Sequence, residues 1–284
     1  MATQNLVWFI TGANAGFGLL LTELALSHGH TVVATARSFS KFPDSLKSNP
    51  KADLVEVEIS GPGSAINAVV AGAIQRHGQI DVLVNNAGFG HLGAVEEVSE
   101  AEARYQFDVN FFGLLNFTKA VIPYMREQKS GIIVQVSSGA GLWAGVGGPI
   151  YVASKHAVEG LAEGLANEVK PLGIRVHLVE PGIFRTDFLK AASQGKQLGE
   201  KKEGYLDNGS IMGGLHQSQP GDPKKAVQRM FEMVTGTGMG QGKEWDLRVP
   251  LGSDVYGMRD QKIKSLTETA EKMKDISLST DFAS

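Results

Sequence analysis

The chain alternates short apolar runs with longer segments of helical spacing. Seven runs rich in β-branched residues stand at 6–10, 31–35, 54–59, 81–84, 132–137, 174–179 and 244–249. Each run is almost continuously apolar, which is typical of parallel strands covered on both faces. Because successive parallel strands are joined by right-handed crossovers, the pattern predicts an α/β fold. We expect a doubly wound, mostly parallel seven-stranded Rossmann-type sheet with helices on both faces.

Capping signals mark several of the helices between these runs. Gly29 is placed to end the first helix, and Ser64 to open another. Ser99 with Glu102 forms a capping box before a helical stretch at 102–126. Asp222 followed by Pro223 predicts the start of a later helix.

Two segments break the alternation. Residues 190–221 have few apolar anchors, and we expect a substrate flap at about 184–221. The segment after 252 has an amphipathic pattern and is expected to pack on the domain as an extra helix. The sequence thus predicts one dinucleotide-binding and catalytic domain at 1–252 and a C-terminal helical extension at 253–284. The apolar positions of that extension are Val255, Met258, Ile263, Leu266 and Ala270.

Composition narrows the function classes. The 284 residues are 42% hydrophobic and 20% charged with a formal net charge of -3, which does not indicate a nucleic-acid partner. The chain has no cysteine, so disulfides and cysteine-bound metals are excluded, and its seven histidines show no metal-ligand spacing. No apolar run reaches the roughly 18 residues of a membrane span. We expect a cytoplasmic protein with no metal and no membrane partner.

A glycine-rich turn, TGANAGFG, follows the first predicted strand. Gly12, Gly16 and Gly18 let the backbone approach a pyrophosphate, and the helix that follows offers free N–H groups and a favourable dipole. Such turns also occur in loops that bind nothing. Its position at the first helix of a βαβ chain favours a dinucleotide site.

The end of the second predicted strand bears on the choice of cofactor. An acid that would bind the ribose 2′-hydroxyl of NAD is absent there, and Arg37 and Ser38 take its place. A guanidinium can pair with a 2′-phosphate, which favours NADP(H) over NAD(H). The alternative is that Arg37 is a solvated charge at a strand end.

Three residues form a candidate proton-transfer group. Tyr151 and Lys155 lie four apart in a predicted helix and emerge from one face. An ammonium beside a phenol favours the phenolate, so Tyr151 can act as a proton shuttle. Ser138, after the fifth predicted strand, can donate a hydrogen bond to a substrate oxygen. Each element alone also occurs by chance or as ordinary structure.

Taken together, these motifs resemble the short-chain dehydrogenase/reductase family from Leu6 to about Leu251. The resemblance implies a catalytic tetrad of Asn110, Ser138, Tyr151 and Lys155. It further implies an adenosine-side NNAG segment at 85–88 and a nicotinamide-side segment after the sixth strand. The implied cofactor-binding residues are Thr11, Gly12, Asn14, Gly16, Phe17, Gly18, Arg37, Ser38, Glu58, Ile59, Asn86, Ala87, Gly88, Tyr151, Lys155, Pro181, Gly182, Ile183 and Thr186.

Two positions depart from the family pattern. Ala15 stands where many NADP-preferring members carry a basic residue, which weakens the preference for NADP. Glu58 stands where an aspartate often contacts adenine, and Ile59 is its expected neighbour.

The implied function is an NADP(H)-dependent oxidoreductase that interconverts a carbonyl and an alcohol, with Tyr as acid and base. The expected substrate is a small, moderately hydrophobic ketone, aldehyde or alcohol, in contact with Ser138, Trp143, Tyr151, Phe184 and Phe188. Three alternatives stay open. They are an NADP(H)-binding sensor without turnover, an NAD-preferring alcohol dehydrogenase of the same family, and a sugar epimerase or dehydratase of its extended branch.

By resemblance, the helical segments 102–126 and 150–170 could pair subunits into a dimer or tetramer. The alternative is a monomer in which the C-terminal helix covers them.

Overall fold

A computed structural model describes residues 5–145, 148–193, 201–205, 214–215 and 217–282. At its centre lies a sheet of seven parallel strands in the order β3-β2-β1-β4-β5-β6-β7. The chain runs outward from β1 to β3 and then returns to place β4 beside β1, so the predicted doubly wound sheet is confirmed. The strands are β1 (Val7–Ile10), β2 (Thr31–Ala36), β3 (Ala52–Glu56), β4 (Val82–Asn85), β5 (Gly131–Val136), β6 (Ile174–Pro181) and β7 (Arg248–Leu251).

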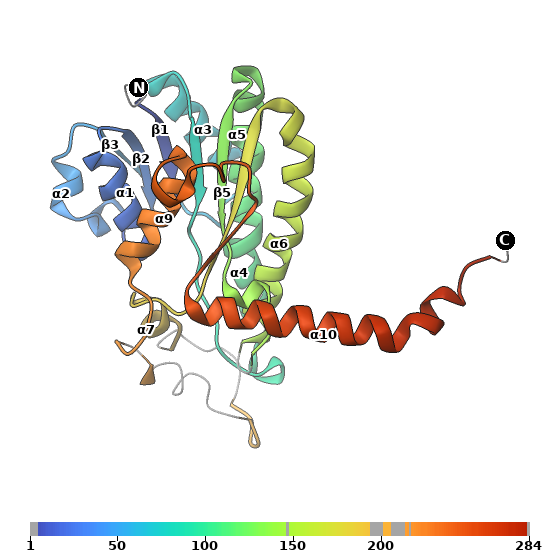
Figure 1. Cartoon of the computed structure of the whole chain (residues 1–284). Helices are drawn as coiled ribbons and strands as arrows, with labels where there is room; N and C mark the ends of the chain where they lie inside the picture. Colours follow the sequence, from blue (N-terminus) through green and yellow to red (C-terminus); the bar gives the residue numbers. More distant parts are fainter. Residues whose placement is uncertain (1–4, 146–147, 194–200, 206–213, 216, 283–284) are drawn as a thin grey trace.

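Helices cover both faces of this sheet (Figure 1). Alternate side chains of β1 point to opposite faces. Trp8 and Ile10 belong to the core that includes α1 (Gly16–Ser27) and α9 (Pro223–Thr235). Phe9 belongs to the opposite core, whose three helices are α3 (Gly63–His77), α5 (Leu114–Gln128) and α6 (Pro149–Val169).

Shorter elements join these layers. They are η1 (Phe39–Lys41), α2 (Asp44–Lys47), η2 (Val95–Glu97), α4 (Glu100–Phe107), the π-helical segment η3 (Asp108–Gly113), η4 (Gly139–Gly141), η5 (Lys170–Leu172), α7 (Phe188–Ser193) and η6 (Gly238–Gly240). The last helix is α10 (Ser253–Leu278).

The predicted caps at Ser99, Asp222 and Gly29 are confirmed, whereas α3 begins at Gly63 after Pro62 and Ser64 lies inside its first turn. The Ser99 hydroxyl accepts a hydrogen bond from the backbone N–H of Glu102, whose carboxylate accepts one from the Ser99 N–H at 2.9 Å. Asp222 accepts from the N–H of Lys224 at 2.9 Å. Gly29, just past α1, has φ +84°, a conformation that favours glycine.

Two strands, the third and the seventh, differ most from the predicted apolar runs, and the other five differ from theirs by one or two residues at an end. The third strand is Ala52–Glu56 rather than 54–59, because its partner β2 ends at Ala36, which pairs with Glu56. The seventh is Arg248–Leu251 rather than 244–249. Since β7 is an edge strand with a partner on one side only, it tolerates Pro250, which interrupts the sequence pattern.

The expectation that the C-terminal helix packs on the domain is wrong for most of its length. Val255 is its one buried residue, and the side chains of Ile263 and Leu266 are 55% and 58% exposed. Figure 1 shows α10 leaving the body after its first turns and projecting away from it. It does not cover the helical segments 102–126 and 150–170.

The flap expected at 184–221 contains residues 194–200, 206–213 and 216, which lie outside the described residues. Among the residues that are described, no helix has both the length and the apolar character that a bilayer span requires.

Replacing Phe117 by alanine tests the packing of α5. Its ring is fully buried, with its centroid 5.4 Å from that of Phe9. Removing it should lower the free energy of unfolding by about 3–5 kcal/mol, measured by urea denaturation. Phe112 is 49% exposed, and Phe112→Ala should change the same quantity by less than about 0.5 kcal/mol. Equal losses in the two variants would contradict the assigned core.

Candidate active site

The turn after β1 is tied to the turn after the neighbouring strand β4. The Thr11 hydroxyl accepts hydrogen bonds from the backbone N–H groups of Asn86 and Ala87, both at 3.0 Å. In return, the Asn86 side-chain amide donates to the carbonyl of Thr11 at 2.9 Å. The glycine turn and the NNAG segment therefore form one structural unit at the carboxyl edge of the sheet.

The glycine turn packs closely against the NNAG segment and leads into the uncapped start of α1. Gly12 has φ +66°, and a Cβ there would lie 2.9 Å from the Cα of Ala87. Ala15 gives the first turn of α1 no side-chain cap. Free N–H groups at a helix start attract a phosphate. Asn14 and Phe17 are half-buried in this turn.

The end of β2 lies beside the same turn, because the N–H of Ala13 donates to the carbonyl of Thr35 at 2.8 Å. Arg37 follows two residues later and is exposed, and its guanidinium makes no ion pair within the described part of the chain. Ser38 is half-buried, and its hydroxyl lies 2.9 Å from that of Ser40. Arg37 is therefore available to an anionic ligand.

The predicted adenine-side residues differ from one another in their surroundings. Glu58 is exposed, and its carboxylate accepts a hydrogen bond from the Ser60 hydroxyl at 2.9 Å. Ile59 is buried and packs against Gly113, where a Cβ would collide with it. Gly88 lies near Asn110, whose Oδ1 would be 3.2 Å from a Cβ at that glycine.

The side chain of Tyr151 interacts with that of Ser138. Tyr151 lies in the first turn of α6, which begins at Pro149, and Ser138 follows β5. Burial raises the pKa of Tyr151 to about 12, and a side-chain hydrogen bond with Ser138 lowers it in part. The phenol is therefore protonated at neutral pH. The Ser138 oxygen also accepts from the N–H of Ala140 at 3.1 Å.

Lys155 lies one turn further along α6, with its Nζ 5.9 Å from the centroid of the Tyr151 ring. The ammonium donates to the carbonyl of Val136 at 2.8 Å and is 5% exposed. Burial lowers the pKa of Lys155 to about 8, and the carboxylate of Glu159 acts in the opposite direction. A positive charge thus stands beside the phenol at neutral pH.

Asn110 lies in the π-helical segment η3, which interrupts the helical stretch between α4 and α5. Its side-chain oxygen accepts from the N–H of Phe89 at 3.0 Å. Its amide donates to the carbonyl of Phe89 at 2.9 Å and to the Ser154 hydroxyl at 3.1 Å. Ser154 in turn donates to the carbonyl of Tyr151 at 2.7 Å. Asn110 therefore fixes the start of α6 relative to the segment after β4.

The segment after β6 returns toward the glycine turn. A Cβ added to Gly16 would lie 4.0 Å from the Thr186 side chain, so the two segments are close neighbours at this point. Gly182 donates from its N–H to the carbonyl of Leu251 at 2.8 Å. The N–H of Ile183, a predicted nicotinamide-side residue, donates to Asp254 of α10 at 2.7 Å. A carboxamide that accepts a hydrogen bond from this N–H must share the N–H with the Asp254 carboxylate or displace that carboxylate. Pro181 ends β6 and is buried.

The predicted substrate residues fall into two groups. The centroid of the Phe188 ring lies 5.8 Å from that of the Tyr151 ring, and Phe188 is 37% exposed. Phe188 therefore presents an apolar surface beside the phenol. Phe184 is buried and its ring meets that of Phe17 edge-on at 5.3 Å. Trp143 is half-buried, and its backbone N–H donates to the carbonyl of Gly139 at 3.1 Å. Phe184 therefore packs within the protein, and Phe188 is the one that adjoins the phenol.

A group of buried charges next to this site was missed by the sequence analysis. Glu159 accepts from the hydroxyl of Ser137 and is 2.5 Å from the Arg248 guanidinium. Arg248 also pairs with Glu180, which is almost fully buried. A Cβ on Gly141 would lie 2.5 Å from the Glu159 carboxylate. The signal in the sequence was a carboxylate four residues after Lys155, on the helix face that covers the sheet.

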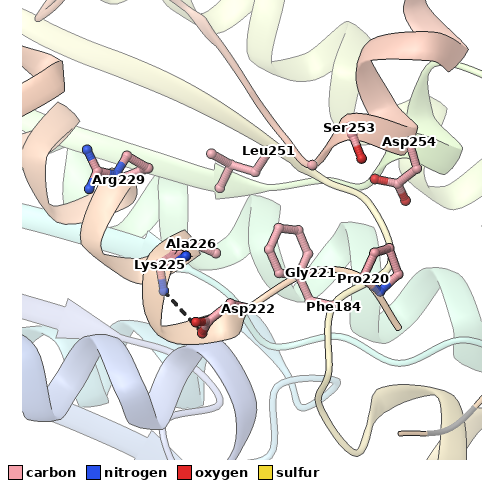
Figure 2. Close-up of a pocket in the computed structure, with 11 residues that line it drawn as sticks. Phe184, Pro220, Gly221, Asp222, Lys225, Ala226, Arg229, Leu251, Ser253 and Asp254 are labelled. Carbon is pink, nitrogen blue, oxygen red and sulfur yellow. Dashed lines mark hydrogen bonds between the residues drawn. The ribbon is translucent and has the colours of Figure 1, made fainter. Parts of the chain in front are cut away.

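A pocket of about 240 Å³ lies between the start of α9, the end of β7 and the start of α10 (Figure 2). Phe184, Gly221 and Leu251 are among its lining residues, and none of the four predicted catalytic residues lines it. Because Phe184 also packs against Phe17, this pocket is separated from the glycine turn by that ring.

In the described ranges of the chain, no group of three or more His, Cys, Asp or Glu side chains could hold a metal ion.

Comparison with known proteins agrees with the resemblance. A family model described as short chain dehydrogenase matches residues 6–197. The chain is 32% identical to oxidoreductase BOA17 of Botryotinia fuckeliana over 279 residues, which cover 96% of this chain and 98% of that protein. It is 38% identical to the 3-ketodihydrosphingosine reductase of Bacteroides thetaiotaomicron over 205 residues, with 72% and 73% covered.

Solved structures show the same architecture. A short-chain dehydrogenase from Streptomyces avermitilis matches with a TM-score of 0.86 and 36% identity, covering 98% of this chain and 100% of that chain. A short chain dehydrogenase from Burkholderia cenocepacia in complex with NADP matches with a TM-score of 0.71 and 25% identity, covering 96% and 99%.

The buried carboxylate of Glu180 should make stability depend on pH. Burial and the neighbouring Glu159 raise the pKa of Glu180 to about 7, above its ordinary value of 4.5. Between these pH values the folded protein holds a proton that the unfolded chain has released, so this residue's contribution to stability falls as pH rises from 4.5 to 7.

Glu180→Gln should remove this dependence, so the variant should gain stability relative to the wild type as pH rises from 5 to 8. Urea midpoints of both proteins measured across that range give the difference. Glu163→Gln is the control, because Glu163 contacts the same Arg248 but is 54% exposed. A constant difference between wild type and Glu180→Gln would contradict the assigned environment.

Proposed function

Because the chain belongs to the short-chain dehydrogenase family, we propose that it is an NADP(H)-dependent oxidoreductase that interconverts a ketone or aldehyde and an alcohol by hydride transfer. The observation that carries this proposal is that the Tyr151 phenol interacts with Ser138 while the buried ammonium of Lys155 lies 5.9 Å from the centroid of the Tyr151 ring. That group lies at the carboxyl edge of the sheet, next to the glycine turn, where open α/β sheets bind ligands.

The residues fit a dinucleotide. The uncapped start of α1 and the left-handed backbone of Gly12 suit a pyrophosphate, and Arg37 is exposed at the end of β2, where a 2′-phosphate would be bound. Gly88 leaves room next to Lys155, whose Nζ would be 3.7 Å from a Cβ there. The NADP complex of the Burkholderia cenocepacia relative supports the same cofactor class.

When bound, the cofactor supplies the hydride for reduction or accepts it in oxidation. Ser138 holds the substrate oxygen with a hydrogen bond, and Tyr151 gives that oxygen its phenolic proton. A phenol whose pKa is about 12 remains protonated at neutral pH, which suits reduction. Oxidation needs the phenolate, and the ammonium of Lys155 favours that form by charge attraction.

An apolar carbonyl compound is the substrate class that the site supports best. The centroid of the Phe188 ring lies 5.8 Å from that of Tyr151, so an apolar ring adjoins the phenol. The 38% identical relative named a 3-ketodihydrosphingosine reductase supports a keto group as the reacting centre.

Tyr151→Phe should keep the affinity for NADPH and lower turnover by about 10²–10⁴-fold, because it removes only the proton donor. Binding is measured by NADPH fluorescence and turnover by the absorbance of reduced nicotinamide, with a panel of hydrophobic ketones and aldehydes. Tyr105→Phe is the control, since Tyr105 lies on α4 and is 40% exposed. Full activity of Tyr151→Phe would reject the mechanism. NADPH binding by the wild type without turnover of any panel compound would favour the sensor alternative.

Arg37→Ala should raise the dissociation constant for NADPH by about 10–100-fold, because a charge-assisted hydrogen bond to phosphate is lost. The dissociation constant for NADH should stay within about twofold, since NADH has no 2′-phosphate. Both constants are measured by fluorescence titration, with Lys41→Ala, a nearby exposed cation, as the control. If NADPH and NADH weaken equally, the NADP preference is wrong and the NAD-preferring alternative stands.

A further inference from the structure

The projecting part of α10 has an apolar stripe that nothing in the described chain covers. Ile263, Leu266, Ala270 and Met273 follow one another at spacings of three, four and three residues. The Ile263, Leu266 and Met273 side chains are 55%, 58% and 46% exposed. Figure 1 shows this part of the helix standing clear of the body. We call residues 260–278 the distal helix.

This spacing is that of a coiled-coil seam. A strict three-and-four repeat makes a narrow stripe that fits the same stripe on one other helix, whereas a helix on a domain surface needs a wider apolar face. An isolated helix of this length is only marginally stable in water. The stripe therefore favours a single helix as the partner of the distal helix.

The charges beside the stripe match a second copy of the same helix in the antiparallel direction. In this register Ile263 faces Met273 of the second copy, and Leu266 faces its Ala270. Asp260 and Lys274 lie on the same flank of the stripe, and antiparallel helices bring these flanks together, so Asp260 of one copy lies beside Lys274 of the other. The two-fold axis repeats this opposite-charge pair. Asp260 contacts Arg259 of its own helix at 3.1 Å through one oxygen, so the other oxygen can accept Lys274.

The remaining flanking positions carry no like-charge pair in this register. Lys262 lies beside Ile276 of the second copy, so the aliphatic part of the lysine can cover that side chain. At the two-fold axis, Thr267 meets Thr267 of the second copy, and Thr269 meets its Thr269. In a parallel pair, Lys262 would face Thr267 and Thr269 would face Lys274, which gives no opposite-charge contact. The charges therefore select the antiparallel arrangement.

We propose that the distal helix pairs in an antiparallel coiled coil with the distal helix of a second copy of this chain, forming a two-fold symmetric dimer. A two-fold contact of this kind is closed, so it ends at the dimer. The interface differs from the one that the helical segments 102–126 and 150–170 would make, and it does not depend on the enzymatic proposal.

Charge reversal at the paired positions tests the register. Asp260→Lys places lysine opposite Lys274, and Lys274→Asp places aspartate opposite Asp260, so each variant alone should self-associate about tenfold more weakly than the wild type. An equimolar mixture of the two variants restores both opposite-charge pairs and should regain nearly wild-type association. Dissociation constants are measured by analytical ultracentrifugation of the full chain.

Matched controls reverse charges on the outer face of the same helix. Lys264 and Glu268 contact each other at 4.0 Å away from the stripe. Lys264→Asp and Glu268→Lys change the net charge by the same amounts as the test variants and should leave association unchanged. All four positions are exposed, so equal melting temperatures by circular dichroism check that the variants fold.

A crosslink tests direction independently of charge. The chain has no cysteine, so Thr267→Cys introduces a single thiol that meets its own copy in the antiparallel pair and is kept apart in a parallel one. Oxidation should give a disulfide-linked dimer on a non-reducing gel, while Glu268→Cys on the outer face should not. A chain that is monomeric at all concentrations, or a dimer that neither the mixture nor the crosslink affects, would overturn the proposal.

Discussion

The parallel pairing of β1 with β4 is the constraint on which the candidate site depends. Because the chain runs out to β3 before it returns, the strand order reverses between β1 and β4, and open α/β sheets bind their ligands at such a reversal. The Thr11 hydroxyl joins the two turns by accepting from Asn86 and Ala87. Asn110 then ties the segment after β4 to α6 through Phe89 and Ser154. The position of the phenol thus follows from the topology of the sheet through a short series of hydrogen bonds.

Buried charge is the second constraint on α6. A lone buried ion costs several kcal/mol, and the cost is offset only where an opposite charge and further hydrogen bonds compensate it. Here Arg248 of the edge strand reaches Glu159 of α6 and Glu180 of β6, so three elements are joined by one guanidinium. Glu159 also holds Ser137, the residue before Ser138. The catalytic candidates are therefore positioned by ion pairs as well as by apolar packing.

Sequence reasoning succeeded where the cause is local. The continuous apolar runs predicted the parallel sheet, and the Ser99 box and Asp222 cap predicted helix starts, because these signals lie within a few residues. The turn at Gly12 was also visible, since glycine there serves a backbone shape. The limits of β7 were missed because Pro250 looks like the end of a strand in the sequence. An edge strand can include a proline, and only the sheet topology shows that β7 is at the edge. The roles of the site residues stay predictions.

What sequence could not show is which surface an amphipathic segment meets. The stripe on α10 was visible, but whether it faces the domain depends on the direction in which the helix leaves β7. That direction is fixed at its first turn, where Val255 is buried, Asp254 accepts from Ile183, and the Met258 sulfur would lie 3.2 Å from a Cβ on Gly139. These contacts reach both the Ser138 segment and the segment after β6. An α-helix rises 1.5 Å per residue, so the direction set at this first turn carries the rest of α10 (Ser253–Leu278) away from the candidate active site beside which it is anchored.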